Sequence, residues 1–143
     1  MCSSDLVFQG RSFMTACCAA VDAAGALSFA SAGHPPLLVR RAAGGVESAG
    51  PHGTMLGIFE DLPLQPESHF QLAAGDAALL YSDGLFSLMN AEGERFTTDD
   101  VRATVSAARP GKKFLQTVVG GMGKRSNGEP REDDLAALAV VRL

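Results

Sequence analysis

Three aspartates stand at the ends of apolar segments that have the pattern of buried strands. Asp83 follows the run AALLYS, and the pair Asp133 and Asp134 precedes the closing run LAALAVVRL. Neighbouring carboxylates repel each other, and burying one without a partner costs roughly several kcal/mol. If the two runs are neighbouring strands, the carboxylates can converge on one hard cation with oxygen ligands and waters. The pattern therefore predicts a metal site of Asp83, Asp133 and Asp134. A solvated turn for the pair, and a helix N-cap for Asp83, are the alternatives.

Two further residues are candidates for a structural role at this site. Gly84 follows Asp83 directly, and a glycine there lets the backbone turn sharply and leaves space near the carboxylate. His34 lies in the stretch AGHPP, where a histidine can act as a general acid or a ligand. The two prolines that follow it favour a histidine that stabilises a turn.

Three basic residues come shortly before the aspartate pair, namely Lys124, Arg125 and Arg131. They can contact a substrate phosphate or simply keep a loop soluble, and the second role is the more common one. The surrounding stretch GGMGKRSNG does not make a phosphate-binding loop. Val118 stands where that motif needs its first glycine, and Arg125 where it needs Ser or Thr.

The composition is that of one globular domain. The chain has 143 residues, of which 46% are hydrophobic and 20% charged, with a formal net charge of -4. This charge argues against nucleic acid as a partner, because phosphate-binding surfaces need excess Lys and Arg. No apolar run approaches the roughly 18 residues of a membrane span, so we expect no membrane. Three cysteines cannot form a closed disulfide framework, which favours a cytoplasmic protein.

The order of the predicted elements is typical of an α+β fold rather than of alternating βαβ units. The chain begins with two hairpins and continues with a strand buried on both faces, a cluster of helices and one returning strand. We expect one of the adjacent pair Cys17 and Cys18 in the core, because neighbours on a strand face opposite sides. The predicted segments are hairpins at 13–34 and 37–48, a strand at 77–81, helices starting near 82, 97 and 112, a loop at 123–134 and a strand at 135–143.

Several stretches resemble the metal-dependent PPM (PP2C-type) serine/threonine phosphatases, in particular the bacterial sporulation stage II E and sigma-factor regulator branch. They occur in the family's order, which is a stronger signal than any one of them, and they cover residues 13–143. The stretches are ASAGHPPLLVRR, GTMLGIF, LAAGDAALLYSDGLFSLMN, GERF and EDDLAALAVV.

The resemblance implies a sandwich of two antiparallel sheets flanked by helices, with Mn or Mg ions at one end. In such enzymes a metal-activated water attacks the phosphorus of phosphoserine or phosphothreonine without a phosphoenzyme. By position, Asp83 and Asp133 match metal-binding aspartates, Asp134 is a less direct candidate, and Gly84 matches a structural glycine. The implied partner is a phosphorylated regulatory protein of the anti-sigma-factor antagonist type.

The sequence also departs from the family pattern. The expected Asp-x-x-Gly-His-Gly segment, whose aspartate bridges two metals, does not occur before AGHPP, and Ser87 and Ala136 replace a common acid and a common threonine. We therefore interpret residues 13–143 as the C-terminal part of a phosphatase domain, with an incomplete two-metal site and weak metal binding. Residues 1–12 are an N-terminal lead segment, either the remnant of a helix or an expression scar.

Three hypotheses remain at this stage. The first is a metal-dependent phosphoserine phosphatase of bacterial signalling, of which this chain is a part that is inactive alone or completed by a second copy. The second is a catalytically silent module of the same fold that binds a partner or forms a homo-oligomer. The third is an unrelated metal-binding α+β domain. The first two require Asp83 and Asp133 at the same end of one sheet.

Overall fold

The computed structural model describes residues 13–50, 53–59, 67–126 and 134–143. The chain forms two compact units, which we describe one at a time. One unit contains the described residues up to Pro36 together with those of Ala49–Gln71, and the other contains Leu37–Ser48 and the described residues from Leu72 onwards. The predicted lead at 1–12, Asp133 and Arg131 lie outside the described residues.

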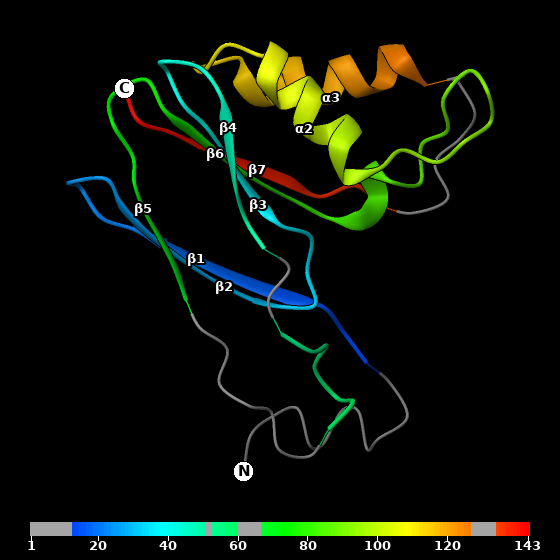
Figure 1. Ribbon diagram of the computed structural model, residues 1–143, viewed down its shortest axis with the longest axis horizontal. Helices are drawn as coiled ribbons and strands as arrows, with labels where there is room; N and C mark the ends of the chain where they lie inside the picture. Colours follow the sequence, from blue (N-terminus) through cyan, green and yellow to red (C-terminus); the bar gives the residue numbers. More distant parts are fainter. Residues whose placement is uncertain (1–12, 51–52, 60–66, 127–133) are drawn as a thin grey trace. The chain divides into compact units, whose positions relative to one another are not determined.

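The first unit is a three-stranded antiparallel sheet in the order β1-β2-β5 (Figure 1). The first predicted hairpin is confirmed, with Val21 opposite Leu27 at its closed end and Gly25 in the turn at a positive φ of 86°. The carboxylate of Asp22 accepts a hydrogen bond from the Ala26 amide across this turn at 2.8 Å. The strands are β1 (Ala16–Val21), β2 (Ala26–Ala32) and β5 (Ser68–Gln71).

The second unit is a four-stranded antiparallel sheet in the order β4-β3-β6-β7, with two helices on one of its faces (Figure 1). The second predicted hairpin and the returning strand are confirmed. The fold is therefore of the predicted α+β class, built from two antiparallel sheets and α-helices. The elements are β3 (Leu37–Arg40), β4 (Val46–Ala49), β6 (Ala77–Tyr81), α2 (Thr98–Ala107), α3 (Phe114–Arg125) and β7 (Ala137–Val141).

The start of α2 shows why the second predicted helix forms. Thr97 and Asp100 make a capping box: the Thr97 side chain accepts from the Asp100 amide, and the Asp100 carboxylate accepts from the Thr97 amide. Val101 and Val105 follow at helical spacing, and both are fully buried. A capped first turn and a buried stripe together fix α2 on the sheet.

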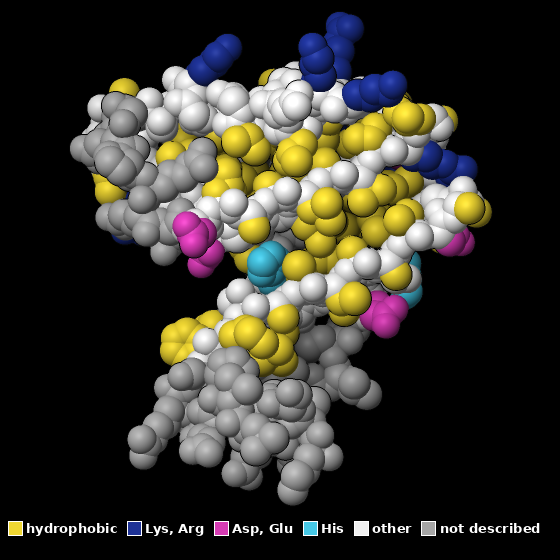
Figure 2. Space-filling view, turned by 180° about the vertical axis from the view of Figure 1, so that it is seen from behind, with side chains coloured by type: hydrophobic (Ala, Val, Ile, Leu, Met, Phe, Trp, Pro, Cys, Tyr) yellow, Lys and Arg dark blue, Asp and Glu magenta, His cyan; other side chains and the backbone are white. Residues whose placement is uncertain are grey.

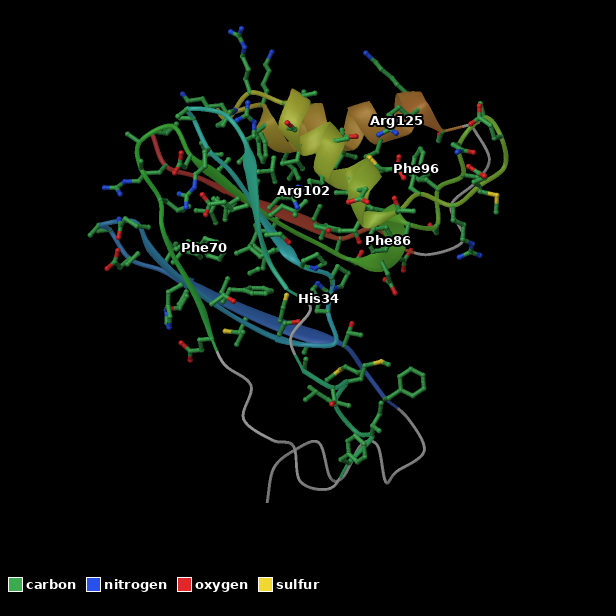
Figure 3. All side chains as sticks on the ribbon, in the orientation of Figure 1. His34, Phe70, Phe86, Phe96, Arg102 and Arg125 are labelled. Carbon is green, nitrogen blue, oxygen red and sulfur yellow. The ribbon has the colours of Figure 1, made fainter. Side chains whose placement is uncertain are left out.

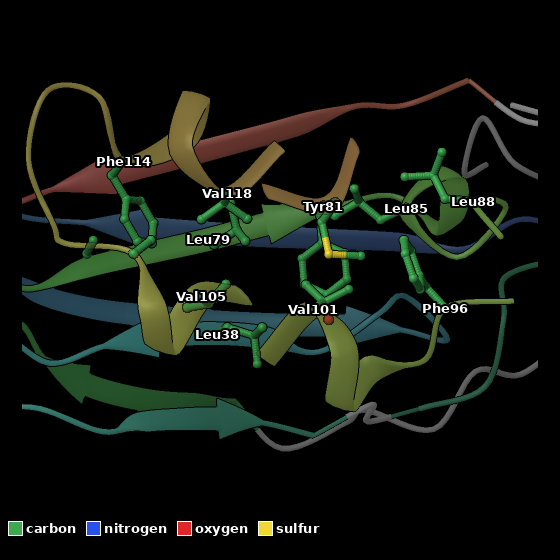
Figure 4. Close-up of a cluster of buried hydrophobic side chains, with 13 residues drawn as sticks. Leu38, Leu79, Tyr81, Leu85, Leu88, Phe96, Val101, Val105, Phe114 and Val118 are labelled. Carbon is green, nitrogen blue, oxygen red and sulfur yellow. The ribbon is translucent and has the colours of Figure 1, made fainter. Parts of the chain in front are cut away.

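The core of the second unit lies between this sheet and the two helices (Figure 4). β6 contributes from the centre of the sheet, because it pairs with β3 on one side and β7 on the other. The apolar stripe of α3 is core, as predicted, since Phe114 and Val118 are buried. The buried cluster consists of Leu38, Ala77, Leu79, Tyr81, Leu85, Leu88, Phe96, Val101, Val105, Ala108, Phe114, Val118 and Met122.

The helix predicted from Ser82 is wrong. The structure has only a short 3₁₀ turn, η1 (Asp83–Leu85), and Ser82 makes no side-chain cap there. Its hydroxyl instead bonds to the segment before β7, so the cap that a helix would need is not available. The chain then turns back on itself, because the Phe96 amide donates to the Leu88 carbonyl at 3.0 Å.

Two smaller predictions also need correction. The loop predicted from Gly123 begins later, because α3 continues to Arg125. The expected core cysteine is absent from the described strand: Cys17 is half-buried and Cys18 exposed. The reason is that β1 lies at the edge of its sheet, where its side chains are only partly covered. In the described parts of the chain, no helix has the length and apolarity needed to cross a membrane.

Candidate metal centre

The end of β6 and the beginning of β7 lie side by side. The two strands pair antiparallel with Tyr81 opposite Ala137, so the residues just after β6 and just before β7 share one end of the sheet. Ser82 ties these segments together: its hydroxyl accepts from the Ala136 amide at 2.9 Å and donates to the Asp134 carbonyl at 3.2 Å. Asp83 and Asp134 are therefore held at the same sheet end. The hypothesis names Asp133 for this position, and Asp133 lies outside the described residues.

Gly84 is the residue that allows this close approach. A Cβ atom at Gly84 would lie 2.4 Å from the Asp134 carbonyl oxygen and 2.8 Å from its carbonyl carbon. Both contacts are to backbone, which cannot swing away as a flexible side chain can. Gly84 therefore permits the close packing of these two chain segments. Its place at a metal site stays a prediction.

The carboxylates themselves are open to solvent. Asp83 and Asp134 are both exposed, and among the described residues neither carboxylate has a hydrogen-bond donor or an ion-pair partner. Ser87, which stands where the family often has an acid, is buried and donates its hydroxyl to the Gly84 carbonyl at 2.9 Å. Ser87 therefore braces the turn.

The donor set fits one partly hydrated hard cation better than a closed protein cage. Among the residues that the structure describes, no three His, Cys, Asp or Glu side chains come together as a metal-binding group. Mg²⁺ keeps several waters and often uses only one or two carboxylates, so Asp83 and Asp134 are sufficient in kind for a single ion. Weak binding of the ion, expected from the sequence, stays a prediction, because Asp133 lies outside the described residues.

His34 lies in the turn that follows β2, in the first unit (Figure 3). Ser31 fixes this turn, because its hydroxyl accepts from the His34 amide and donates to the His34 carbonyl, both at 3.2 Å. The imidazole Nδ1 is 3.4 Å from the Thr15 hydroxyl. These contacts agree with a turn-stabilising histidine, and a role for His34 at the metal site stays a prediction.

Arg125 is held within the second unit by the start of α2 (Figure 3). Its Nη2 lies 2.6 Å from Asp100 Oδ1, its Nη1 donates to the Thr104 hydroxyl at 3.1 Å, and the guanidinium stacks 5.4 Å from the centre of the Phe96 ring. A phosphate contact by Arg125 would have to compete with these partners. Lys124 is exposed, and its phosphate contact stays a prediction.

A further carboxylate, Asp76, was not singled out in the sequence and has the opposite surroundings. It precedes β6, is 3% exposed, and accepts from the Ala42 amide at 2.8 Å, the Ala73 amide at 2.9 Å and Arg41 Nη1 at 2.7 Å. Burial alone raises the pKa of Asp76, but the hydrogen bonds from the two amides and Arg41 hold its pKa below the ordinary value. Arg41 also pairs with Glu47 at 2.7 Å. Asp76 therefore joins the β3–β4 hairpin to the start of β6.

Comparisons with solved structures show which fold the chain has. The SiaA-PP2C domain of Pseudomonas aeruginosa matches with a TM-score of 0.76 and 19% identity, over 97% of this chain and 56% of that one. The phosphatase domain of SpoIIE from Bacillus subtilis (Mn presoaked) matches with a TM-score of 0.64 and 18% identity, over 90% and 56%. The fold is that of PP2C-type phosphatase domains.

The sequence gives the family. The family model for Stage II sporulation protein E (SpoIIE) matches residues 4–143, and the chain belongs to this family. A structure of the RsbU and RsbW domains of a Mycobacterium tuberculosis protein is 26% identical, with a TM-score of 0.66, over 87% of this chain and 35% of that one. The chain thus spans between about a third and just over half of the length of the chains it matches. No curated protein matches it in sequence.

Proposed function

We propose that this chain is part of a metal-dependent protein serine/threonine phosphatase, and that it holds a divalent cation, Mn or Mg, through Asp83 and the Asp133–Asp134 pair. The observation that carries the proposal is the joining of the two acidic segments by Ser82 and Gly84 in a member of the SpoIIE family. Two similar structures are consistent with such an ion, since one is a SpoIIE domain presoaked with Mn and another is RsbX in complex with magnesium.

The residues of this chain would hold and orient the reacting groups. Asp83 and Asp134 offer carboxylate oxygens at the sheet end, and the Ser82 hydrogen bonds keep the two segments in register. When bound, the metal acts as a Lewis acid that polarises the phosphoryl group and lowers the pKa of water. Lys124 and, outside the described residues, Arg131 are the basic side chains proposed to meet a phosphate.

The proposed substrate is a phosphoserine on a bacterial regulatory protein of the anti-sigma-factor antagonist type. The support is the resemblance to the sigma-factor regulator branch and the similarity to the structure that contains RsbU and RsbW domains. A second copy or a further segment would supply the carboxylate that the described residues lack.

A chimera tests the proposal. We would fuse this chain behind the part of the SiaA-PP2C domain that it does not cover, and measure Mn-dependent hydrolysis of a phosphoserine peptide. We expect turnover that Asp83→Asn reduces by at least about a hundredfold, because a bound metal ion contributes several kcal/mol of charge stabilisation and the variant would lose one of its ligands. Turnover that survives the substitution would contradict the role of Asp83.

A second candidate is a catalytically silent module that binds a partner. It is favoured by one observation, the absence of a three-residue metal-binding group among the described residues. A folded chimera without hydrolysis, whose Mn affinity is unaffected by Asp83→Asn, would support this candidate against the first. Hydrolysis by the unfused chain, lost in Asp83→Asn, would instead show that the carboxylates present here are enough.

A further inference from the structure

The loop between α2 and α3 carries three exposed cations in five residues. Arg109, Lys112 and Lys113 are all exposed, and the structure gives their side chains no ion pair or hydrogen bond among the described residues. Figure 2 shows Lys and Arg side chains projecting along the helix layer of the second unit, with no acidic side chain among them in that view. We call Arg109, Lys112 and Lys113 the α2–α3 basic loop.

A fourth cation, Arg40, lies next to this loop and adds to its positive charge. Arg40 Nε donates to the Ser106 carbonyl in the last turn of α2 at 3.1 Å, which brings its guanidinium next to the loop. Two nearby acids, Glu47 of β4 and the buried Asp76 before β6, do not neutralise it, because both bind Arg41. The positive charge is therefore left over after the internal ion pairs are formed, although the whole chain carries a net charge of -4.

The basic loop lies away from the candidate metal centre. Arg40 pairs with Ala77 at the start of β6, whereas Asp83 follows the end of the same strand. β6 has five residues, and at about 3.3 Å per residue the strand separates these two ends by roughly 15 Å. A partner on the loop would therefore leave the metal end of the sheet accessible.

We propose that the α2–α3 basic loop is a docking surface for an acidic polypeptide segment. Charge complementarity selects this occupant, because like charges on one short loop repel until a partner of opposite charge approaches. A membrane is a poorer match: none of the exposed large apolar side chains of the described residues lies in the loop, so nothing inserts into lipid. Nucleic acid is a poorer match because the patch is small and the chain is acidic overall.

The test uses the purified chain and a short fluorescein-labelled peptide of alternating Glu and Gly, followed by fluorescence anisotropy. We expect binding that weakens with added salt and becomes about tenfold weaker when Arg109, Lys112 and Lys113 are all changed to Gln, since each exposed cation contributes a modest share. The charge-conserving triple variant, Arg109→Lys with Lys112→Arg and Lys113→Arg, should bind like the wild type.

A matched pair of single variants separates local from overall charge. Arg109→Gln and Arg95→Gln each remove one exposed arginine, the first from the α2–α3 basic loop and the second from the segment before α2. We expect only Arg109→Gln to weaken peptide binding, by about two- to threefold. Equal weakening by both variants would overturn the proposal, because it would show a response to net charge alone.

Two further outcomes would also overturn it. The first is peptide binding that the triple Gln variant leaves unchanged. The second is stronger binding to phosphatidylserine vesicles or to a DNA duplex than to the acidic peptide, which would identify a different class of partner. The thermal midpoint of the triple Gln variant should not fall, since these side chains make no described contacts, so lost binding cannot be attributed to unfolding.

Discussion

The two aspartates that flank β6 have the same side chain and opposite surroundings. Asp76, before the strand, is buried and accepts hydrogen bonds from two amides and an arginine. Asp83, after the strand, is exposed, and among the described residues its carboxylate has no partner. A carboxylate that stabilises a fold is enclosed and satisfied, whereas one available for a ligand is held in place by its backbone alone. The contrast separates a structural acid, Asp76, from the acid that we propose as a metal ligand, Asp83.

The largest expected effect on stability is at Asp76, the buried acid before β6. Asp76→Asn removes the charge that Arg41 and two amides are arranged to meet, and we expect the free energy of unfolding to fall by about 3 kcal/mol. Urea unfolding followed by circular dichroism would measure it. A loss below about 0.5 kcal/mol would mean that the Asp76 network is not structural.

The pH dependence of stability tests whether the ionised Asp76 carboxylate stabilises the fold. The pKa of Asp76 is lowered in the folded chain, so its stabilisation is present above its ordinary pKa of 3.8 and is lost as the pH falls through the lower, folded value. We expect wild-type stability to decrease below about pH 4, and Asp76→Asn to show a shallower decrease. Parallel pH profiles for the two proteins would contradict the assignment.

A second large effect is expected at Gly84. An added methyl group would meet the Asp134 backbone at 2.4 Å, so Gly84→Ala must push the segments after β6 and before β7 apart. We expect a loss of about 2 kcal/mol in unfolding free energy, together with weaker Mn binding. Full stability with unchanged metal affinity would show that the close approach of the two segments is not needed.

A smaller effect is expected at the start of α2, where a third acid, Asp100, forms a capping box with Thr97. Thr97→Ala removes one half of the capping box with Asp100 at the start of α2, and we expect a loss of about 1 kcal/mol in unfolding free energy. Thr97→Ser keeps the hydroxyl and should retain most of the stability. If the two variants are equally unstable, the methyl group of Thr97 and not the cap is what matters.

The smallest effect on stability is expected at Asp83. Because its carboxylate is exposed and has no described partner, Asp83→Asn should change the metal-free free energy of unfolding by less than about 0.5 kcal/mol. The same urea unfolding that reports Asp76→Asn would measure it. A destabilisation comparable to that of Asp76→Asn would remove the distinction between the two ends of β6.

Local patterns in the sequence predicted most of the fold. Both hairpins, the apolar strand β6, the capped helix α2 and the closing strand β7 were predicted from residues close together in the chain. The helix expected from Ser82 failed because its hydroxyl bonds to Ala136, 54 positions away. Local helix signals cannot reveal such a distant partner.

The candidate site was predicted only in part, for the same reason. Asp83 and Gly84 were recognisable beside an apolar strand, and the order of the matching stretches indicated the family. The contribution of Ser82 depends on the pairing of distant segments, because Ser82 and Ala136 are 54 positions apart. The structural role of Asp76 at the other end of β6 was missed in the same way, because its partner Arg41 is 35 positions away. Asp133 and Arg131 lie outside the described residues and stay predictions.

The central claim is that the exposed carboxylate end of β6 and β7 holds a divalent cation. Isothermal titration with Mn²⁺ tests it most directly, using the wild-type chain, Asp83→Asn, and Asp99→Asn as a control that removes one exposed carboxylate from α2. We expect a dissociation constant of roughly 10⁻⁴–10⁻³ M for the wild type and for Asp99→Asn, and at least about tenfold weaker binding for Asp83→Asn. Equal affinity for all three proteins would contradict the claim.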